Sequence, residues 1–294
     1  MSLSSRLGIG FMRTLARLPL PLVRGFGKVL GRVLYVVAVS RRHVVQTNLA
    51  LCLPQKSKAE RDAIARETFV FVAQSWLDRS WLWHAPEAVV ASRLRVVGSS
   101  SEIDEIAHGS APMILFAPHF YGLDAAATAL TMHTARPSTT IYTTQRDPLV
   151  DAWIREGRQR FGNVITLNRT EGIKPIVAGL RKNGLLYLLP DMDFGREQSV
   201  FVPFYGVPAA TLPSLSRFAR LGKAKVVPVV SRLTATGYDI EVLPAWQNFP
   251  SDDAVADTAL MNTRLQGYID AMPSQYYWVH RRFKTRPEGA PPVY

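Results

Sequence analysis

The chain has 294 residues and a net charge of +12, from 35 Lys and Arg against 23 Asp and Glu. Hydrophobic residues make up 47%, which excludes a disordered chain, and the length allows one large domain or two smaller ones. A single cysteine, Cys52, excludes an internal disulfide, and the six histidines follow no ligand spacing, so we expect no metal. The basic balance favours an anionic partner: nucleic acid, acidic lipid headgroups or acidic proteins.

The first forty residues have the pattern of a basic amphipathic helical segment. Their apolar runs are interrupted by cations, so they are too short to span a bilayer, and Pro19 and Pro21 should divide the segment into two helices. Residues 1–59 contain no Asp or Glu. An ordinary core-packing helix with a solvated face is the alternative, but the absence of acidic residues favours a membrane interface. We therefore predict a membrane-associating segment at residues 1–40 and a separate domain at 41–294. The cations recur on one side of the expected helix: Arg6, Arg13, Arg17, Arg24, Lys28 and Arg32.

The rest of the chain alternates apolar strands with helical patterns. After a helical stretch at 58–83, strands are expected at 111–118, 139–144, 163–167, 184–190, 225–231 and 238–244. Helices are expected at 122–133, 148–161, 172–183 and 253–272. This alternation predicts an α/β fold with a mostly parallel sheet flanked by helices.

His119 and Asp124 lie where such a fold binds its ligands. His119 follows the apolar strand 111–118, and Asp124 falls in the first turn of the next helix. Ligands of open α/β sheets bind at the carboxyl ends of strands. A carboxylate beside the imidazole would fix its tautomer and let it remove a proton from a hydroxyl. A hydrogen-bonded strand-end histidine and a helix-stabilising aspartate remain the structural alternative.

Other catalytic motifs are absent from the sequence. There is no G-x-S-x-G, and Cys52 has no neighbouring histidine in a motif, so a covalent nucleophile has no support. The phosphate-binding patterns G-x-x-x-x-G-K-[ST] and G-x-G-x-x-G are missing as well. A His-Asp base acting on the hydroxyl of an acceptor is the chemistry that remains.

Five blocks in order carry a family resemblance. They are "RRHVVQTNLALCLPQKSKAER" (41–61), "PHFYGLD" (118–124), "NRTEGIKPIVAGLRKNGLLYLLPDMDFG" (168–195), "SVFVPFYGVPAATLPSLSRFARLGKAKVVPVV" (199–230) and "QYYWVHRRFKTRPEG" (275–289). Together they resemble the late acyltransferases of lipid A biosynthesis, the lauroyl and myristoyl transferases of Gram-negative bacteria, with a glycerolipid acyltransferase-like fold.

The resemblance implies transfer of an acyl chain from acyl carrier protein to a hydroxyl of an anionic lipid A precursor, with no covalent acyl-enzyme and no cofactor. It implies His119 as general base and Asp124 as its orienting partner. Backbone N–H groups near residues 120–122, or a guanidinium, would face the oxyanion. Arg169 is expected to bind the phosphate or thioester side of a substrate, and Asp191 to hold a turn at the substrate site. The location implied is the cytoplasmic face of the inner membrane, and no nucleic-acid partner is expected.

Two other functions remain open at this point. The first is an acyltransferase acting on a different membrane lipid, such as an ornithine lipid or a glycolipid. The second is a non-catalytic, basic membrane-binding or nucleic-acid-binding protein that keeps the fold. The aromatic and basic run at 278–287 suits nucleic acid and anionic glycolipid alike, but no nucleic-acid-binding module surrounds it.

Overall fold

A seven-stranded sheet forms the centre of the computed structural model, which describes residues 3–294. The strand order is β1-β9-β8-β2-β5-β3-β4, and every neighbouring pair is parallel except β8 and β9. The expected α/β fold with a mostly parallel sheet is thereby confirmed. The strands are β1 (Leu94–Gly98), β2 (Met113–Phe116), β3 (Pro137–Tyr142), β4 (Asn163–Asn168), β5 (Leu185–Leu188), β8 (Lys225–Leu233) and β9 (Tyr238–Val242).

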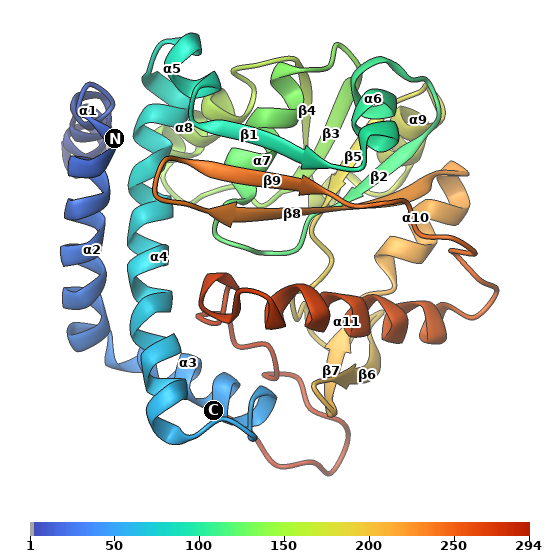
Figure 1. Cartoon of the computed structure of the whole chain (residues 1–294). Coiled ribbons are helices and arrows are strands. Elements are labelled where there is room, and N and C mark those ends of the chain that lie inside the picture. The colour runs from blue at the N-terminus through green and yellow to red at the C-terminus, as the bar shows by residue number, and fades with distance from the viewer. Residues whose placement is uncertain (1–2) are drawn as a thin grey trace.

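Helices cover both faces of the sheet, and two more stand at one end of its strands. Because side chains alternate along a strand, Leu115 and Tyr187 face one core while Phe116 and Leu188 face the other. In Figure 1, α2 and α4 stand side by side across one end of the strands β8 and β9, and α11 crosses below the sheet. The helices are α1 (Leu3–Leu15), α2 (Leu20–Val37), α3 (Val39–Cys52), α4 (Lys58–His84), α5 (Glu87–Ala91), α6 (Ser100–His108), α7 (Leu123–Met132), α8 (Pro148–Arg158), α9 (Lys174–Arg181), α10 (Ser214–Gly222) and α11 (Ala254–Asp270).

The N-terminal helices pack tightly against the rest of the chain. The predicted break at the prolines is confirmed, because α1 ends at Leu15 and α2 begins at Leu20. A β-carbon at Gly31 would lie 2.4 Å from the Cα of Val70, so glycine allows α2 to approach α4 this closely. Among residues 3–294, no helix combines the length and apolar character that a bilayer span requires.

Arg24 corrects the predicted stripe of cations. Its guanidinium is buried and forms an ion pair with Asp78 of α4 at 2.9 Å. It also donates hydrogen bonds to the carbonyl oxygens of Thr234 and Gly237, in the turn between β8 and β9. The side chain therefore joins three elements of the protein and does not face solvent. Helical spacing shows which side of a helix a residue occupies. It does not show that one cation on that side is buried, because burial depends on a partner from elsewhere in the chain.

The sequence patterns missed β1, α3, α5, α6, α10 and a small antiparallel hairpin of β6 (Val200–Phe204) and β7 (Val207–Thr211). Tyr205 and Gly206 form the hairpin turn, with φ values of 52° and 75°. Two successive positive φ values are typical of tight hairpin turns, and a glycine at the second position was the available signal. The hairpin packs on α11 and lies on the side of the molecule where the C-terminal tail ends, as Figure 1 shows.

Candidate active site

His119 lies just beyond the carboxyl end of β2, in a loop held by the C-terminal segment. Phe120 forms a β-bridge with Tyr276, and the N–H of Tyr277 donates to the carbonyl oxygen of His119 at 3.0 Å. The ring of Tyr277 lies 6.0 Å from the imidazole, centre to centre. The block at 275–289, one of the five that carry the family resemblance, therefore packs against His119. More than 150 residues separate the two in the sequence.

Asp191 is the carboxylate that contacts His119. Its Oδ1 lies 2.7 Å from Nδ1 of the imidazole, and its Oδ2 accepts the backbone N–H of His119 at 3.0 Å. Tyr276 donates its hydroxyl to the same Oδ2 at 3.1 Å. Burial alone would raise the pKa of the Asp191 carboxyl, but the imidazole and its hydrogen bonds outweigh burial and lower that pKa. An ionised Asp191 keeps the proton on Nδ1 and leaves Nε2 as the basic nitrogen.

The expected pairing of His119 with Asp124 is wrong. Asp124 lies in the first turn of α7, where its carboxylate contacts Arg79 of α4 at 2.8 Å and Arg158 of α8 at 3.0 Å. Burial would raise the pKa of Asp124, yet the charges of Arg158 and Arg79 lower it to about 2. The five-residue spacing brings His119 and Asp124 to one cavity, but α7 directs the carboxylate toward α4 and α8 and away from the imidazole Nδ1.

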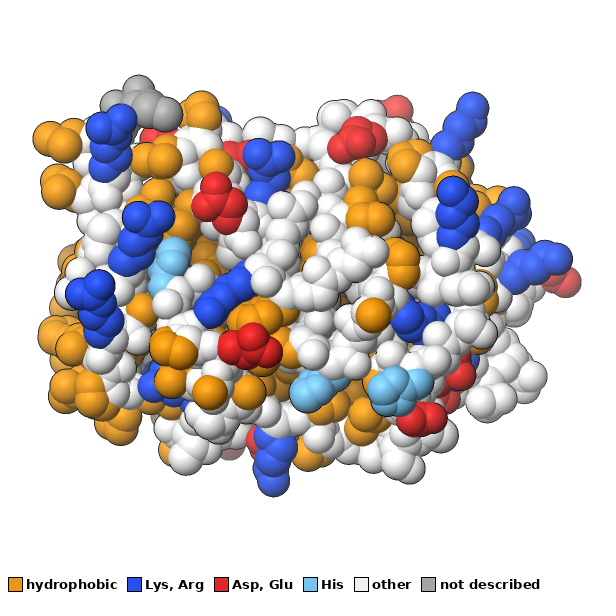
Figure 2. All heavy atoms as spheres, turned by 90° about the horizontal axis from the view of Figure 1, so that it is seen from above, with side chains coloured by type: hydrophobic (Ala, Val, Ile, Leu, Met, Phe, Trp, Pro, Cys, Tyr) orange, Lys and Arg blue, Asp and Glu red, His pale blue; other side chains and the backbone are white. Residues whose placement is uncertain are grey.

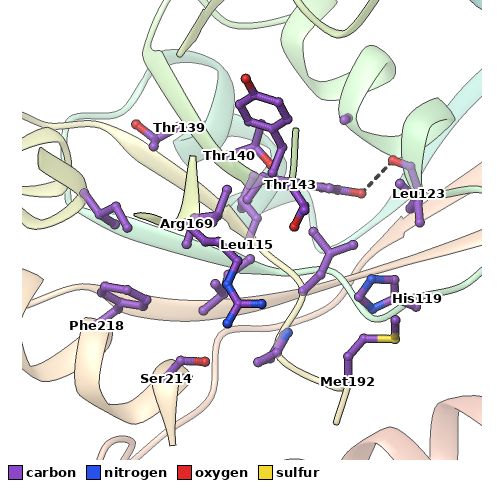
Figure 3. Close-up of a pocket in the computed structure, with 18 of the residues that line it drawn as sticks. Leu115, His119, Leu123, Thr139, Thr140, Thr143, Arg169, Met192, Ser214 and Phe218 are labelled. Carbon is purple, nitrogen blue, oxygen red and sulfur yellow. Dashed lines mark hydrogen bonds between the residues drawn. The ribbon is translucent and has the colours of Figure 1, made fainter. Parts of the chain in front are cut away.

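A cavity of about 750 Å³ connects these groups. It is lined by His119, Asp124 and Arg169, with apolar side chains from α7, β2, β5 and α10. Figure 3 shows Ser214 and Phe218 of α10 on one side of this space and His119 with Met192 on the other. The imidazole is partly exposed, with 19% of its side-chain surface accessible, so the cavity gives an outside molecule a route to it. A mostly apolar cavity with a few convergent polar groups is the usual form of a ligand site.

Arg169 follows β4 and begins a short 3₁₀ turn, Arg169–Glu171. Its guanidinium stacks 4.9 Å above the ring of Phe194, and both side chains line the cavity. Asn168 starts the turn by accepting the N–H of Thr170 at 3.0 Å. All four predicted site residues therefore lie at the same end of the sheet. They are His119, Asp124, Arg169 and Asp191.

The C-terminal block proves to be partly internal structure. Arg282, predicted to face an anionic partner with its neighbours, is only 2% exposed and donates to the carbonyl oxygen of Ala210 at 2.8 Å. His280 accepts the N–H of Asp193 at 3.1 Å, and burial is the main cause that lowers the pKa of His280 to about 4. Asp193 in turn accepts the N–H and hydroxyl of Thr285, both at 2.9 Å. These contacts position the loop that carries Asp191.

Sequence reasoning missed Tyr276, Arg79 and Arg158. Tyr276 could have been suspected from its place in the aromatic C-terminal block, whereas the two arginines lie on helices with no local motif. Across residues 3–294, no group of three or more His, Cys, Asp or Glu side chains is arranged to hold a metal ion.

Comparison with known proteins gives the class of the molecule. Residues 3–285 match the family model described as bacterial lipid A biosynthesis acyltransferase. The chain belongs to this family and is therefore an acyltransferase by class.

Among curated proteins, it is 35% identical to a lipid A biosynthesis acyltransferase of Haemophilus influenzae, over 96% of this chain and 88% of that protein. It is 32% identical to the lipid A biosynthesis lauroyltransferase of Escherichia coli, over 98% and 94%. It is 30% identical to the myristoyltransferase of the same pathway and organism, over 96% and 87%.

Proposed function

We propose that this protein transfers a fatty acyl chain from acyl carrier protein to a hydroxyl of a lipid A precursor, with His119 as the general base. The observation that carries the proposal is the His119–Asp191 pair, 2.7 Å apart, at the wall of a large and mostly apolar cavity. A general base needs a ring nitrogen that is oriented and accessible. Because Asp191 contacts only Nδ1, Nε2 is left for this role. Family membership supplies the substrate class.

In the proposed reaction, Nε2 of His119 removes the proton of the acceptor hydroxyl as its oxygen attacks the thioester carbonyl carbon. The tetrahedral intermediate then collapses, the carbon–sulfur bond breaks, and the imidazolium returns the proton to the departing thiolate. The products are an ester and a free thiol, and no covalent acyl-enzyme forms. Asp191 stabilises the imidazolium in between, since a buried carboxylate attracts a positive charge strongly.

The oxyanion of that intermediate needs a hydrogen-bond donor. The N–H groups of Phe120 and Tyr121, two of those expected to serve, already donate to the carbonyl oxygens of Pro118 and Gln275. We therefore favour a guanidinium over these two amides. Arg158 lines the cavity and is held in place by its ion pair with Asp124, so it is our candidate.

We further propose that the protein binds the cytoplasmic face of the inner membrane through α1 and α2. Figure 2 shows hydrophobic side chains gathered at the edge of the molecule that these helices form, with cations beside them. Several of these apolar side chains are more than half exposed, and exposed apolar patches of this kind mark interaction surfaces. They are Leu3, Leu7, Phe11, Leu22, Phe26, Val29, Val33, Val36 and Val37, and the exposed cations near them include Arg13, Arg17, Lys28 and Arg32.

The direct test of the acceptor is mass spectrometry of lipid A from cells with and without the gene. We expect a mass difference of one acyl chain, which also gives the length of the donor chain. Unchanged lipid A together with a change in an ornithine lipid or another glycolipid would identify that lipid as the acceptor.

The test of the mechanism is His119→Ala in the purified protein. We expect acyl transfer to fall about 10²–10⁴-fold, the usual effect of removing an acid–base group, with the melting temperature and membrane binding retained. His119→Gln is the matched control for side-chain volume and should be equally inactive. Full acyl transfer by either variant would rule out His119 as the general base.

A further inference from the structure

The cavity has walls on both faces of the sheet. In the parallel pairing of β3 and β5, Ser138 is opposite Leu185, and both line the cavity on the α7 side. Leu188, Ile176 and Phe218 line it as well, but they belong to the core on the opposite face, under α9 and α10. The space therefore passes around the carboxyl end of the sheet, where His119 lies, and extends along both faces.

Charge is distributed unevenly along these walls. The lining contains four arginines and one acidic residue, Asp124. Asp124 forms ion pairs with Arg79 and Arg158, so its negative charge is balanced on the α7 side of the cavity. Arg169 and Arg217 line the remainder, and neither is in an ion pair with any residue of the described chain, 3–294.

Further hydrogen-bond donors lie near these two arginines, and among the described residues that line the cavity Asp124 alone is acidic. Ser214 lines the cavity at the first turn of α10, and no side chain caps this helix start. Glu171, the acidic residue nearest to Arg169 in sequence, accepts the backbone N–H of Asn168 at 2.6 Å and does not line the cavity. Figure 3 shows Ser214 directed from α10 into the same space as Arg169.

From this imbalance we infer that Arg169 and Arg217, with Ser214, bind a phosphate group of a substrate. The inference rests on the proposed function and adds a second anchoring point to it, away from the base. Guanidinium groups bind phosphate through paired charge-assisted hydrogen bonds, and an uncapped helix start adds backbone N–H donors. Two sources carry this chemistry, the phosphorylated sugar of the acceptor and the phosphopantetheine arm of the acyl carrier protein.

Steady-state kinetics distinguish the two sources. We expect Arg217→Ala to raise one substrate's KM about 10–100-fold, as for a lost charged hydrogen bond, with kcat changed far less. If the acceptor supplies the phosphate, the rise appears with the phosphorylated acceptor and disappears with its dephosphorylated form. If the donor supplies it, the rise is in the KM for acyl carrier protein. An equal rise for both acceptor forms, with the donor KM unchanged, would overturn the inference.

A binding measurement tests the site without relying on activity. Glucose 1-phosphate should raise the melting temperature of the intact protein in a saturable way, and glucose at the same concentration should not. Arg169→Ala and Arg217→Ala should each weaken this response, whereas Arg217→Lys should retain part of it. The control is Arg220→Ala, an exposed arginine on the same helix that does not line the cavity.

The proposed function and the phosphate site can be refuted independently of each other. Absence of transfer to any lipid A precursor by the wild-type protein would refute the proposed function, while the response to glucose 1-phosphate would still support the phosphate site. A response that survives in both alanine variants would refute the phosphate site and leave the proposed function untouched.

Discussion

Two buried carboxylates at the same end of the sheet, Asp191 and Asp124, differ in the chemistry that their partners allow. Both have a lowered pKa, and both are held by hydrogen bonds from neighbouring side chains. Asp191 faces an imidazole, a group that can accept and release a proton, whereas Asp124 faces two guanidinium groups, whose charge is permanent. The His119–Asp191 pair can therefore carry a proton during a reaction. Asp124 and its two arginines can only keep a fixed charge distribution and a fixed geometry. The partner decides which role a carboxylate has.

The largest expected effect comes from breaking the first pair with Asp191→Asn. The amide keeps the shape and can still accept from the backbone N–H of His119, but it cannot stabilise an imidazolium, so we expect kcat to fall about 10²–10⁴-fold. Single-turnover acyl transfer is the measurement. Tyr276→Phe, which removes one hydrogen bond from Asp191, should cost only a few-fold. Comparable losses in both variants would show that packing, and not the charge of Asp191, matters.

Asp124→Asn should act mainly on stability. It leaves Arg79 and Arg158 without their shared counterion, and their side chains are 22% and 25% exposed, so water offsets part of the cost. We expect the free energy of unfolding to fall by about 2–3 kcal/mol, measured by urea titration at pH 7. The lowered pKa of Asp124 gives the sign of the pH effect. The wild-type advantage over the variant should persist above pH 4 and shrink as the pH falls toward 2. An unchanged midpoint in the variant would contradict this role.

A third buried group, His280, extends the comparison to the effect of pH on stability. Its pKa is lowered from 6.5 to about 4, so the unfolded chain binds a proton that the folded chain rejects between these values. Wild-type stability should therefore fall by about 2–3 kcal/mol as the pH drops from 7 to 4. His280→Gln, which can still accept the N–H of Asp193, should show a flatter profile. Since other groups also titrate here, the informative quantity is the difference between the two profiles. Parallel profiles would rule His280 out as their cause.

The sequence allowed most of the fold and half of the proposed catalytic pair to be predicted. The apolar runs of the central strands and the periodic helices between them are local signals, and His119 was recognisable because it follows such a run. The order of strands is not a local signal. β5 lies between β2 and β3 in the sheet, and this insertion brings Asp191 beside His119 across 72 residues. Without that order, Asp124 was the nearest carboxylate in sequence and the wrong partner.

The buried contact of Arg24 with Asp78 and the β8–β9 turn has a consequence for how the protein meets a bilayer. It fastens α2 to the central sheet, so in the proposed membrane-bound state the helix cannot swing on a hinge while the catalytic body moves independently. The height and tilt of the cavity opening above the lipid headgroups are thus set once, at docking. In that proposed state, a lipid acceptor would have to diffuse laterally through the bilayer to reach the cavity opening.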